Sequence, residues 1–242
     1  MIDTHCHLLP GVDDGPATIA AAVELARVLS GHGVEIAVCT PHWSRAFPTT
    51  HGQAAAARAV LSDALRDAGI DLDLVVSAEL SEVVAATHAL AEIRERSIGG
   101  RIVIVELVRD SLPIHAAAVT RRLASAGMTT VLAHPERCSE IQRDPHLLDP
   151  LRAAGARVQI VAPSLTEHGG VHTRDTAWEL LRTGRVDVLA SDAHGAGRRP
   201  SELRAAEAFV TERLGSATWR ELTYEAPQRL LEDVGWTRAP GS

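Results

Sequence analysis

The chain has 242 residues and a mass of 25.8 kDa, which allows either one α/β barrel or two small domains. Its 45% hydrophobic content excludes disorder, and its three cysteines, which form no CxxC pair, exclude a disulfide framework and a zinc ribbon. The formal net charge of -7 argues against general nucleic-acid binding, because phosphate backbones select positively charged surfaces.

The N-terminal segment lacks the features of a targeting sequence. It reads MIDTHCHLLPG, with Asp and His where a signal peptide needs a basic and then an apolar stretch. The sequence also has no run of about 18 uncharged apolar residues that would cross a membrane. We therefore expect a soluble, cytoplasmic protein without membrane insertion, and reduced cysteines suit that compartment.

Short β-branched runs alternate with Ala- and Leu-rich amphipathic segments along the chain. The predicted strands are Ile2–Cys6, Glu35–Cys39, Leu72–Ser77, Arg101–Val105, Thr129–Ala133, Arg157–Val161 and Val186–Ala190. The predicted helices are Thr18–Leu29, Gln53–Ala68, Ile114–Ser125, Pro145–Ala154, Thr173–Thr183 and a region from Pro200 onward.

This alternation predicts an α/β fold with a parallel sheet and right-handed crossovers, either closed as a barrel or open and doubly wound. We expect a single domain over residues 1–237 and a loose tail over residues 238–242. The last helical region, residues 201–235, either closes the fold or forms a subunit contact. The sequence has no GxGxxG or Walker-type loop, which argues against a nucleotide site.

Metal-ligating residue types gather at the predicted C-terminal ends of the strands, where parallel α/β folds place active sites. The first strand ends in His5-Cys6-His7. Because side chains alternate along a strand, both imidazoles face one side and Cys6 faces the core. The two histidines either bind a metal ion or form a hydrogen-bonded pair. Asp192 and His194 repeat the same spacing after the last strand.

Other strand ends add candidate ligands. Pro41 ends the second predicted strand and leaves His42 at its rim, and Glu79 follows the third. Glu106 lies in the apolar run IVIVELV, where a buried carboxylate needs a compensating cation. His134 follows the fifth predicted strand.

The Gly-flanked loop after the first strand carries Asp13 and Asp14, which either form turns and caps or supply one ligand. Together the strand ends offer more ligands than one ion needs, which predicts two or three divalent ions such as Mn, Fe or Zn. Closely spaced ions suit phosphate-ester hydrolysis, because they supply the nucleophile and stabilise the developing charge. Arg137, and Arg198 or Arg199, follow histidine-containing strand ends, where they either bind phosphate or remain solvated surface charges.

Six segments of the chain together resemble one family of enzymes. HCHLLPGVDDG, CTPH, AEL, VELV, AHPER and SDAH, in this order, resemble the polymerase-and-histidinol-phosphatase (PHP) superfamily of metal-dependent phosphoesterases. Within it, the chain resembles the CpsB/CapC protein-tyrosine phosphatases of capsular and exopolysaccharide gene clusters. The resemblance implies a distorted seven-stranded β/α barrel that hydrolyses phosphotyrosine with a hydroxide bridging the ions, of which manganese is expected first. The implied substrate is the tail of a tyrosine kinase that controls polysaccharide export.

The resemblance also implies which residues bind the ions and the phosphate. The implied sets are His5, His7, Glu106 and Asp192 for the first ion, Glu79, Glu106 and His134 for the second, and Asp14, His42 and His194 for the third. Phosphate binding is implied for Arg137 and for Arg198 or Arg199. We favour Arg199, because it directly precedes Pro200.

Departures from the family pattern concern the predicted substrate contacts. Cys138 stands where a Tyr often follows HPER. Gln159 and Ser164 either contact a ligand or satisfy backbone groups at a strand end, and we favour the second role. Trp43 and Phe47 either pack against a phenyl ring or cover the mouth of the fold.

Two other functions remain open at this point. One is a small-molecule phosphomonoesterase of the histidinol-phosphatase type, which uses the same ions with a different pocket. The other is a metal-stabilised regulatory subunit without turnover. A thiol nucleophile is not expected, because the cysteines are not part of a CxxxxxR phosphate loop. The sequence indicates no particular oligomeric state.

Overall fold

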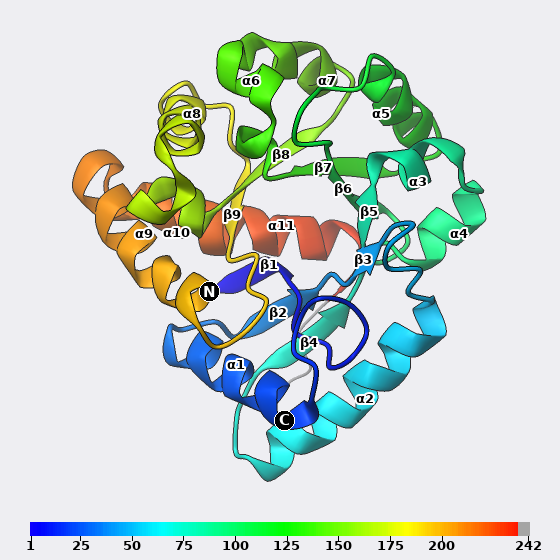
Figure 1. Cartoon of the computed structure of the whole chain (residues 1–242), viewed down its shortest axis with the longest axis vertical. Coiled ribbons are helices and arrows are strands. Elements are labelled where there is room, and N and C mark those ends of the chain that lie inside the picture. The colour runs from blue at the N-terminus through cyan, green and yellow to red at the C-terminus, as the bar shows by residue number, and fades with distance from the viewer. Residues whose placement is uncertain (237–242) are drawn as a thin grey trace.

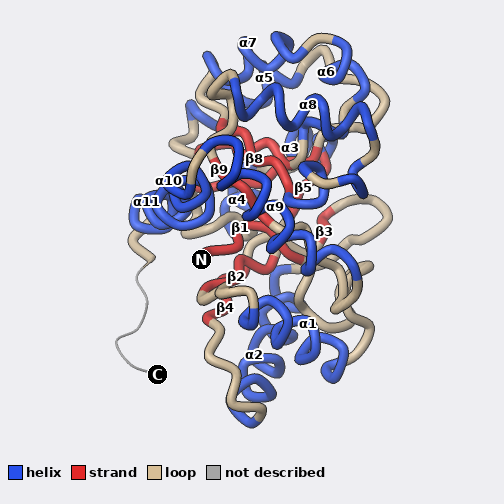
Figure 2. The backbone as a smooth tube through the Cα atoms, turned by 90° about the vertical axis from the view of Figure 1, so that its left-hand side faces the viewer, coloured by secondary structure: helices blue, strands red, loops and turns tan. Residues whose placement is uncertain are grey.

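Parallel strands occupy the centre of the molecule, and helices surround them (Figures 1 and 2). The computed structural model describes residues 1–236 except for the side chains of residues 198–201, so the predicted tail over residues 238–242 lies outside the described residues. The strands are β1 (Ile2–Cys6), β2 (Ile36–Cys39), β3 (His42–Trp43), β4 (Asp73–Val76), β5 (Glu79–Ser81), β6 (Ile102–Glu106), β7 (Thr129–Ala133), β8 (Arg157–Val161) and β9 (Val188–Ala190). All seven predicted strands are therefore present, with small shifts at their ends.

These strands pair in two sheets, with the orders β1-β2-β4 and β3-β5-β6-β7-β8-β9. Two backbone hydrogen bonds link the end of β1 to the segment after β9, from Asp192 N to His5 O (2.9 Å) and from His7 N to Ala193 O (2.8 Å). Over residues 1–236 the strands do not form one closed sheet. The α/β class with parallel strands is confirmed, whereas the expected seven-stranded barrel is not.

Interruptions in the second and third predicted strands account for the two sheets. After β2 the chain passes through Pro41, which has no backbone N–H to continue the ladder. It then re-enters a sheet as β3, where His42 lies opposite Glu79 of β5 in register. We expected both residues to follow a strand end. Instead, each begins a short strand of the second sheet.

The helices lie on the outside of both sheets. The predicted helices are present, and three short ones, α3, α4 and α6, were not predicted because five or six residues show no clear helical period. Among the described residues, none of the helices has the length and apolar character needed to cross a membrane. The helices are α1 (Ile19–Gly31), α2 (His51–Asp67), α3 (Glu82–Thr87), α4 (Leu90–Glu95), α5 (Ala116–Ser125), α6 (Ser139–Arg143), α7 (Asp149–Ala153), α8 (Val171–Arg182), α9 (Arg198–Leu214), α10 (Ser216–Arg220) and α11 (Ala226–Asp233).

Local capping residues determine where the first two helices begin. The side chain of Thr18 accepts a hydrogen bond from Ala21 N at the start of α1. Thr50 and Gln53 form a reciprocal capping box at the start of α2. These caps satisfy N–H groups that the first turn of a helix leaves without a partner.

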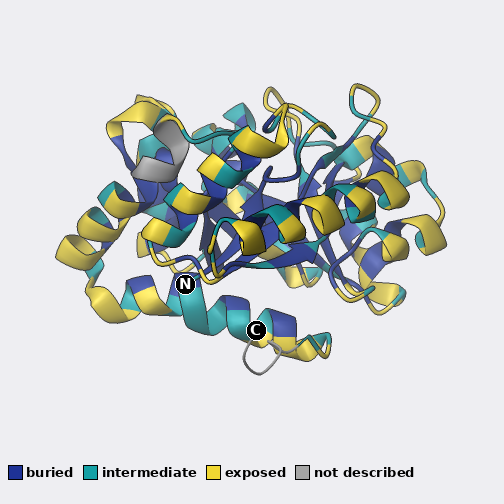
Figure 3. Ribbon diagram, turned by 90° about the horizontal axis from the view of Figure 1, so that it is seen from below, coloured by how far each residue is buried: buried dark blue, intermediate teal, exposed yellow. Residues whose placement is uncertain are grey.

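The C-terminal helix α11 covers the N-terminal ends of the strands. Ile2, Ile36 and Ile102, at the starts of their strands, form a buried cluster with Leu231 of α11. In Figure 3, the strands are buried in the interior and the exposed residues lie on the outer helices. The described part of the last helical region therefore closes one end of the fold and leaves the C-terminal ends of the strands for a site.

Candidate metal centre

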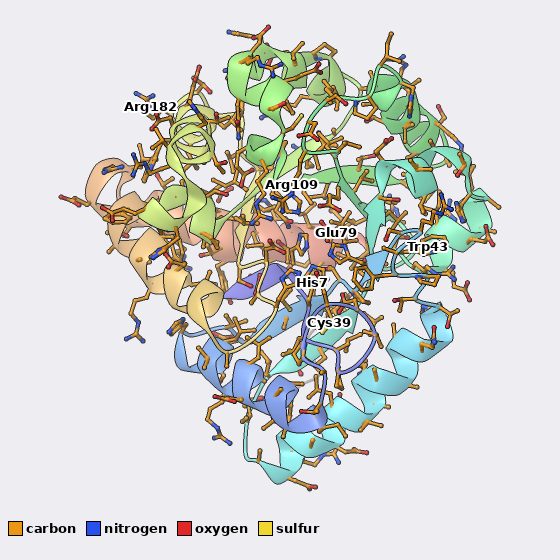
Figure 4. The ribbon with its side chains drawn as sticks, in the orientation of Figure 1. His7, Cys39, Trp43, Glu79, Arg109 and Arg182 are labelled. Atoms are coloured by element: carbon orange, nitrogen blue, oxygen red, sulfur yellow. The ribbon has the colours of Figure 1, made fainter. Side chains whose placement is uncertain are left out.

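Histidine and carboxylate side chains converge at the C-terminal ends of the strands. Figure 4 shows His7 and Glu79 near the middle of the molecule, between elements from both sheets. Four overlapping groups have ligand atoms within 4.8 Å of one another: His7, Asp14, His42 and His194; His5, His134 and Asp192; His5, His7 and Glu79; and His42, Glu79 and Glu106. All nine predicted ligand positions thus lie in one connected cluster.

The end of β1 provides two fully buried imidazoles that face each other. The Nε2 atoms of His5 and His7 lie 3.2 Å apart. On the far side of each ring, Nδ1 of His5 lies 2.8 Å from Gln159 Oε1, and Nδ1 of His7 lies 2.6 Å from Asp13 Oδ2. These partners hold the protons on Nδ1 and direct the Nε2 lone pairs toward the cluster, as second-layer groups do for histidine ligands.

Glu79 lies at the centre of the cluster. Its Oε2 atom is within 3.1–3.3 Å of a ring nitrogen of His5, His7 and His42, yet this buried oxygen makes no hydrogen bond. Its Oε1 atom lies 2.9 Å from His134 Nε2. A buried carboxylate oxygen without a donor is costly, and a cation among these nitrogens would compensate it.

The outer part of the cluster is more exposed to solvent. Asp14 Oδ1 lies 3.6 Å from His42 Nε2 and 3.3 Å from His194 Nε2, and the Asp14 side chain is 47% exposed. Asp13 instead is buried and receives hydrogen bonds from His42 N and Gly15 N. The two neighbouring aspartates therefore differ in role: Asp13 orients His7, and Asp14 faces the outer group.

The tight loop around these aspartates depends on a glycine. A Cβ atom at Gly15 would lie 2.3 Å from the carbonyl oxygen of His7, a distance that no side chain tolerates. The loop can therefore fold back against the end of β1 only with glycine at this position.

Left-handed backbone conformations position two further site residues. Among the described residues, His134 (φ 34°) and Asp192 (φ 52°) are the non-glycine residues with positive φ. His134 directly follows β7, and Asp192 lies two residues after the end of β9. Such conformations cost about 1–3 kcal/mol each and are concentrated at functional sites. Here they turn the chain so that both side chains reach the cluster.

Arg137 is joined to the cluster through Asp192. It belongs to a 3-10 turn, Pro135–Arg137, and its Nη1 atom donates to Asp192 Oδ2 at 2.7 Å. The guanidinium is largely buried. The bond to Asp192 fixes the orientation of the planar guanidinium.

Burial and charge pairing set the protonation of the cluster. Burial raises the pKa of Asp192, but the charges of Arg137 and the histidines outweigh it and hold that pKa well below its usual range. Burial likewise raises the pKa of Glu79, and the charge on His5 and contacts with the other histidines reverse the effect. Burial lowers the pKa of His7, yet the bond to Asp13 and the nearby Glu79 raise it to about 10. Glu79 and Asp192 are therefore ionised, and without a metal His5 and His7 hold balancing protons.

Imidazole nitrogens and carboxylate oxygens in this arrangement fit divalent ions such as Mn, Fe and Zn. A bound cation explains two features: the Glu79 oxygen that makes no hydrogen bond, and the two facing Nε2 atoms of His5 and His7. Ions replace the protons that these groups otherwise share.

The groups in the structure divide the nine residues differently from the implied sets: His134 also groups with His5 and Asp192, and His42 groups with Glu79 and Glu106. Glu106 lies with His42 and Glu79, but not with His5, His7 and Asp192. The carboxylate common to two of the described groups is Glu79. The other phosphate-binding candidates, the side chains of Arg198 and Arg199, lie outside the described residues.

Gln159 has a role that the sequence did not indicate. We favoured backbone contacts for it, and this interpretation is wrong: its amide accepts from His5 and donates to Thr4 Oγ1 at 2.8 Å. Asp3 was missed altogether, although its spacing from His5 and His7 places it on the same side of β1. Its carboxylate receives hydrogen bonds from the backbone and hydroxyl of Ser191, which ties β1 to the segment after β9.

The two aromatic residues after β2 occupy different environments. Trp43 is buried under the guanidinium of Arg96, 4.0 Å from its ring centroid, and is part of the core. Phe47 is partly exposed and stacks on His42, with ring centroids 5.5 Å apart. Only Phe47 of this pair lies against the cluster.

The fold and site define an α/β protein with a histidine and carboxylate cluster at the ends of parallel strands. A family model for capsular polysaccharide synthesis proteins, CpsB/CapC, matches residues 1–232. The chain belongs to this family.

Individual relatives agree with this assignment. The chain is 30% identical to the tyrosine-protein phosphatase YwqE of Bacillus subtilis over 99% of its length and 95% of the relative. It is 23% identical to the tyrosine-protein phosphatase CpsB of Streptococcus pneumoniae, over 96% of its length and 99% of the relative. A solved structure from work on these two metal-dependent tyrosine phosphatases matches with a TM-score of 0.86 and 28% identity, and covers 96% of this chain and 95% of that chain.

Proposed function

We propose that the protein is a metal-dependent protein-tyrosine phosphatase with two or three divalent ions, manganese first among them. One observation carries the proposal: the buried Glu79 Oε2 makes no hydrogen bond and lies beside nitrogens of three histidines. Asp192, in the same cluster, is bonded to Arg137. Such a site combines cation binding with a neighbouring phosphate-binding guanidinium.

The proposed metal ligands are the nine clustered residues. His5, His7 and Glu79 form the buried inner part, and His42, Asp14 and His194 form the outer part that substrate meets first. Bound divalent ions supply the hydrolytic nucleophile and neutralise charge on the phosphoryl group. The carboxylates hold the ions close together, and Gln159 and Asp13 keep His5 and His7 in the ligating tautomer.

Arg137 is proposed to bind the phosphate of the substrate. Its bond to Asp192 fixes the plane of the guanidinium, so two of its other N–H groups can donate to equatorial phosphate oxygens as charge develops. By family resemblance, Arg199 or Arg198 supplies a second cation. The leaving group of phosphotyrosine is a phenolate, whose conjugate acid has a pKa near 10, so it can leave with little help from a general acid.

Phe47 favours an aromatic substrate. Its ring stacks on His42 at the exposed side of the cluster, where a phenyl ring attached to a bound phosphate would pack against it. The proposed substrate is therefore phosphotyrosine on protein, specifically the tail of a tyrosine kinase that controls capsular or exopolysaccharide synthesis in the cytoplasm. The kinase and the compartment rest on the family resemblance.

The test measures phosphate release by metal-stripped protein, with and without added manganese. The substrates are a phosphotyrosyl peptide, the matching phosphoseryl peptide and histidinol phosphate, and bound metal is quantified in parallel. We expect manganese to restore turnover of the phosphotyrosyl peptide and Asp192→Asn to abolish it. Asp63→Asn, which removes an exposed carboxylate on α2, is the matched control.

Each alternative outcome indicates another function. Higher kcat/KM on histidinol phosphate than on the phosphotyrosyl peptide would assign the site to a small-molecule phosphatase. Stoichiometric metal with no turnover of any substrate would assign the protein a regulatory role.

A further inference from the structure

Two exposed arginines lie on loops that follow residues of the candidate metal centre. Arg45 follows His42 by three residues, and Arg109 follows Glu106 by three. His42 and Glu106, from which the two loops begin, have ligand atoms within 4.8 Å of each other. Neither arginine has a role in the function proposed above.

The loop of Arg45 is a rigid turn. Ser44 N donates to Phe47 O at 3.0 Å, and Phe47 N donates to Ser44 Oγ at 3.2 Å. Trp43 is buried on one side of this turn, and Phe47 stacks on His42 on the other. Arg45 therefore lies at the exposed tip of a turn that is held against the cluster.

The loop of Arg109 is also held in place. Its carbonyl oxygen accepts from Ser139 N at 2.7 Å, and the Ser139 hydroxyl donates to the next carbonyl, that of Asp110. Ser139 follows Arg137 by two residues, so this loop is tied to the segment that carries the phosphate-binding candidate. Figure 4 shows Arg109 in the same central region as Glu79 and His7.

The order of the strands sets the spacing of the two loops. The sheet runs β3-β5-β6, so the arginines follow the strands on either side of β5, which begins at Glu79. Two strand steps span about 10 Å. An extended peptide covers the same distance in about three residues. A phosphotyrosine above Glu79 would therefore have its flanking residues near Arg45 on one side and Arg109 on the other.

The charges of these arginines are not compensated. In the described part of the chain, the side chains of Arg45 and Arg109 have no ion-pair partner within 4.0 Å, although Asp110 is adjacent to Arg109. Arg137, by contrast, is paired with Asp192. On a chain with net charge -7, two unpaired cations at the mouth of a site attract anionic groups of a ligand.

We propose that Arg45 and Arg109 select substrates with anionic side chains on both sides of the phosphotyrosine, within about two residues of it. The anion is a carboxylate or a second phosphate, which a guanidinium binds by the same paired N–H groups. This inference rests on the proposed function and specifies the class of phosphotyrosyl segment that the site accepts.

The test compares three phosphotyrosyl peptides that differ only at the two flanking positions. One carries Glu at both positions, one carries Gln at both, and one carries Gln at one position and a second phosphotyrosine at the other. We expect kcat/KM of the manganese-loaded protein to be about three- to tenfold higher for the Glu peptide than for the Gln peptide, with the preference falling at high salt. The doubly phosphorylated peptide shows whether phosphate is preferred to carboxylate.

Variants test whether the preference for the Glu peptide depends on Arg45 and Arg109. Arg45→Gln/Arg109→Gln should reduce the Glu-to-Gln ratio to near one. Arg121→Gln, which removes an exposed charge from the outer helix α5, should keep the ratio of the parent protein. Equal kcat/KM for the Glu and Gln peptides in the parent protein, or a ratio that survives in the double variant, overturns the proposal.

A binding measurement separates this proposal from the proposed function. Fluorescence anisotropy of the same three sequences, with a non-hydrolysable phosphonate in place of the phosphotyrosine phosphate, reports charge selection without turnover. Selective binding that requires both arginines, together with no hydrolysis of any peptide, supports the binding site and refutes the phosphatase. Unselective binding with normal hydrolysis refutes the arginine proposal alone.

Discussion

Gln159 of β8 contacts two neighbouring residues of β1: its side-chain oxygen lies 2.8 Å from Nδ1 of His5, and its amide nitrogen donates to Thr4 Oγ1. The donation to Thr4 determines which end of the amide faces His5. The Nδ1 atom of His5 must then carry the proton, and its Nε2 atom is left as a free ligand that faces His7.

Removing this contact should weaken metal binding without removing a ligand. We expect Gln159→Leu to lower manganese affinity about 10- to 100-fold, because the buried Nδ1–H of His5 loses its partner and the ring loses its orientation. Chelator competition on purified protein measures the change. Thr4→Val removes the contact that orients the amide but keeps the amide itself, which can still turn its oxygen toward His5, so we expect a smaller loss of affinity. Unchanged affinity in Gln159→Leu would show that packing alone orients His5.

Asp13 and Asp14 should give different metal-binding defects. Asp14→Asn removes a carboxylate from the outer group with His42 and His194, so we expect fewer ions bound per chain. Asp13→Asn keeps every proposed ligand but weakens the bond to His7 Nδ1, so we expect full occupancy at about 10- to 100-fold higher metal concentration. Metal titration followed by elemental analysis separates the two effects. The same loss of stoichiometry in both variants would contradict the separate roles.

Residue type and strand position were enough to find the candidate cluster, but not its internal arrangement. His5 and His7 could be paired from the alternation of side chains along one strand. The central place of Glu79 depends on the break at Pro41, which brings His42 opposite Glu79 in a second sheet. The role of Gln159 depends on the approach of β8 to His5, a residue 154 positions away, which no local pattern encodes.

Phe47 and Trp43 should respond differently to truncation. Phe47→Ala should raise KM for a phosphotyrosyl peptide by about two- to tenfold, the range of one aromatic contact, and leave KM for a small alkyl phosphate nearly unchanged. Trp43→Ala should instead destabilise the fold by about 3–5 kcal/mol, because that ring is buried under Arg96. Steady-state kinetics and denaturant unfolding measure the two quantities. Equal changes in KM for both substrates in Phe47→Ala would remove its assignment to the phenyl ring.

The proton held by His7 should make the stability of the metal-free protein depend on pH. Its pKa is raised from 6.5 to about 10 in the folded state, so the stabilisation is fully present below pH 6.5 and is lost as the pH rises toward 10. We therefore expect the melting temperature of chelator-treated protein to fall between pH 7 and 9, by about 2–4 °C for each kcal/mol lost.

Bound manganese should flatten this dependence, because the ion takes the place of the proton on Nε2 of His7, and the ring then no longer titrates between pH 7 and 9. Asp13→Asn should also flatten it in the metal-free protein, since loss of the Asp13 charge brings the pKa of His7 back toward its ordinary value. Thermal melts at pH 6.5, 7.5 and 9 measure all three conditions. A pH dependence that is equally steep in metal-free parent protein and in Asp13→Asn would assign the titrating proton to another group.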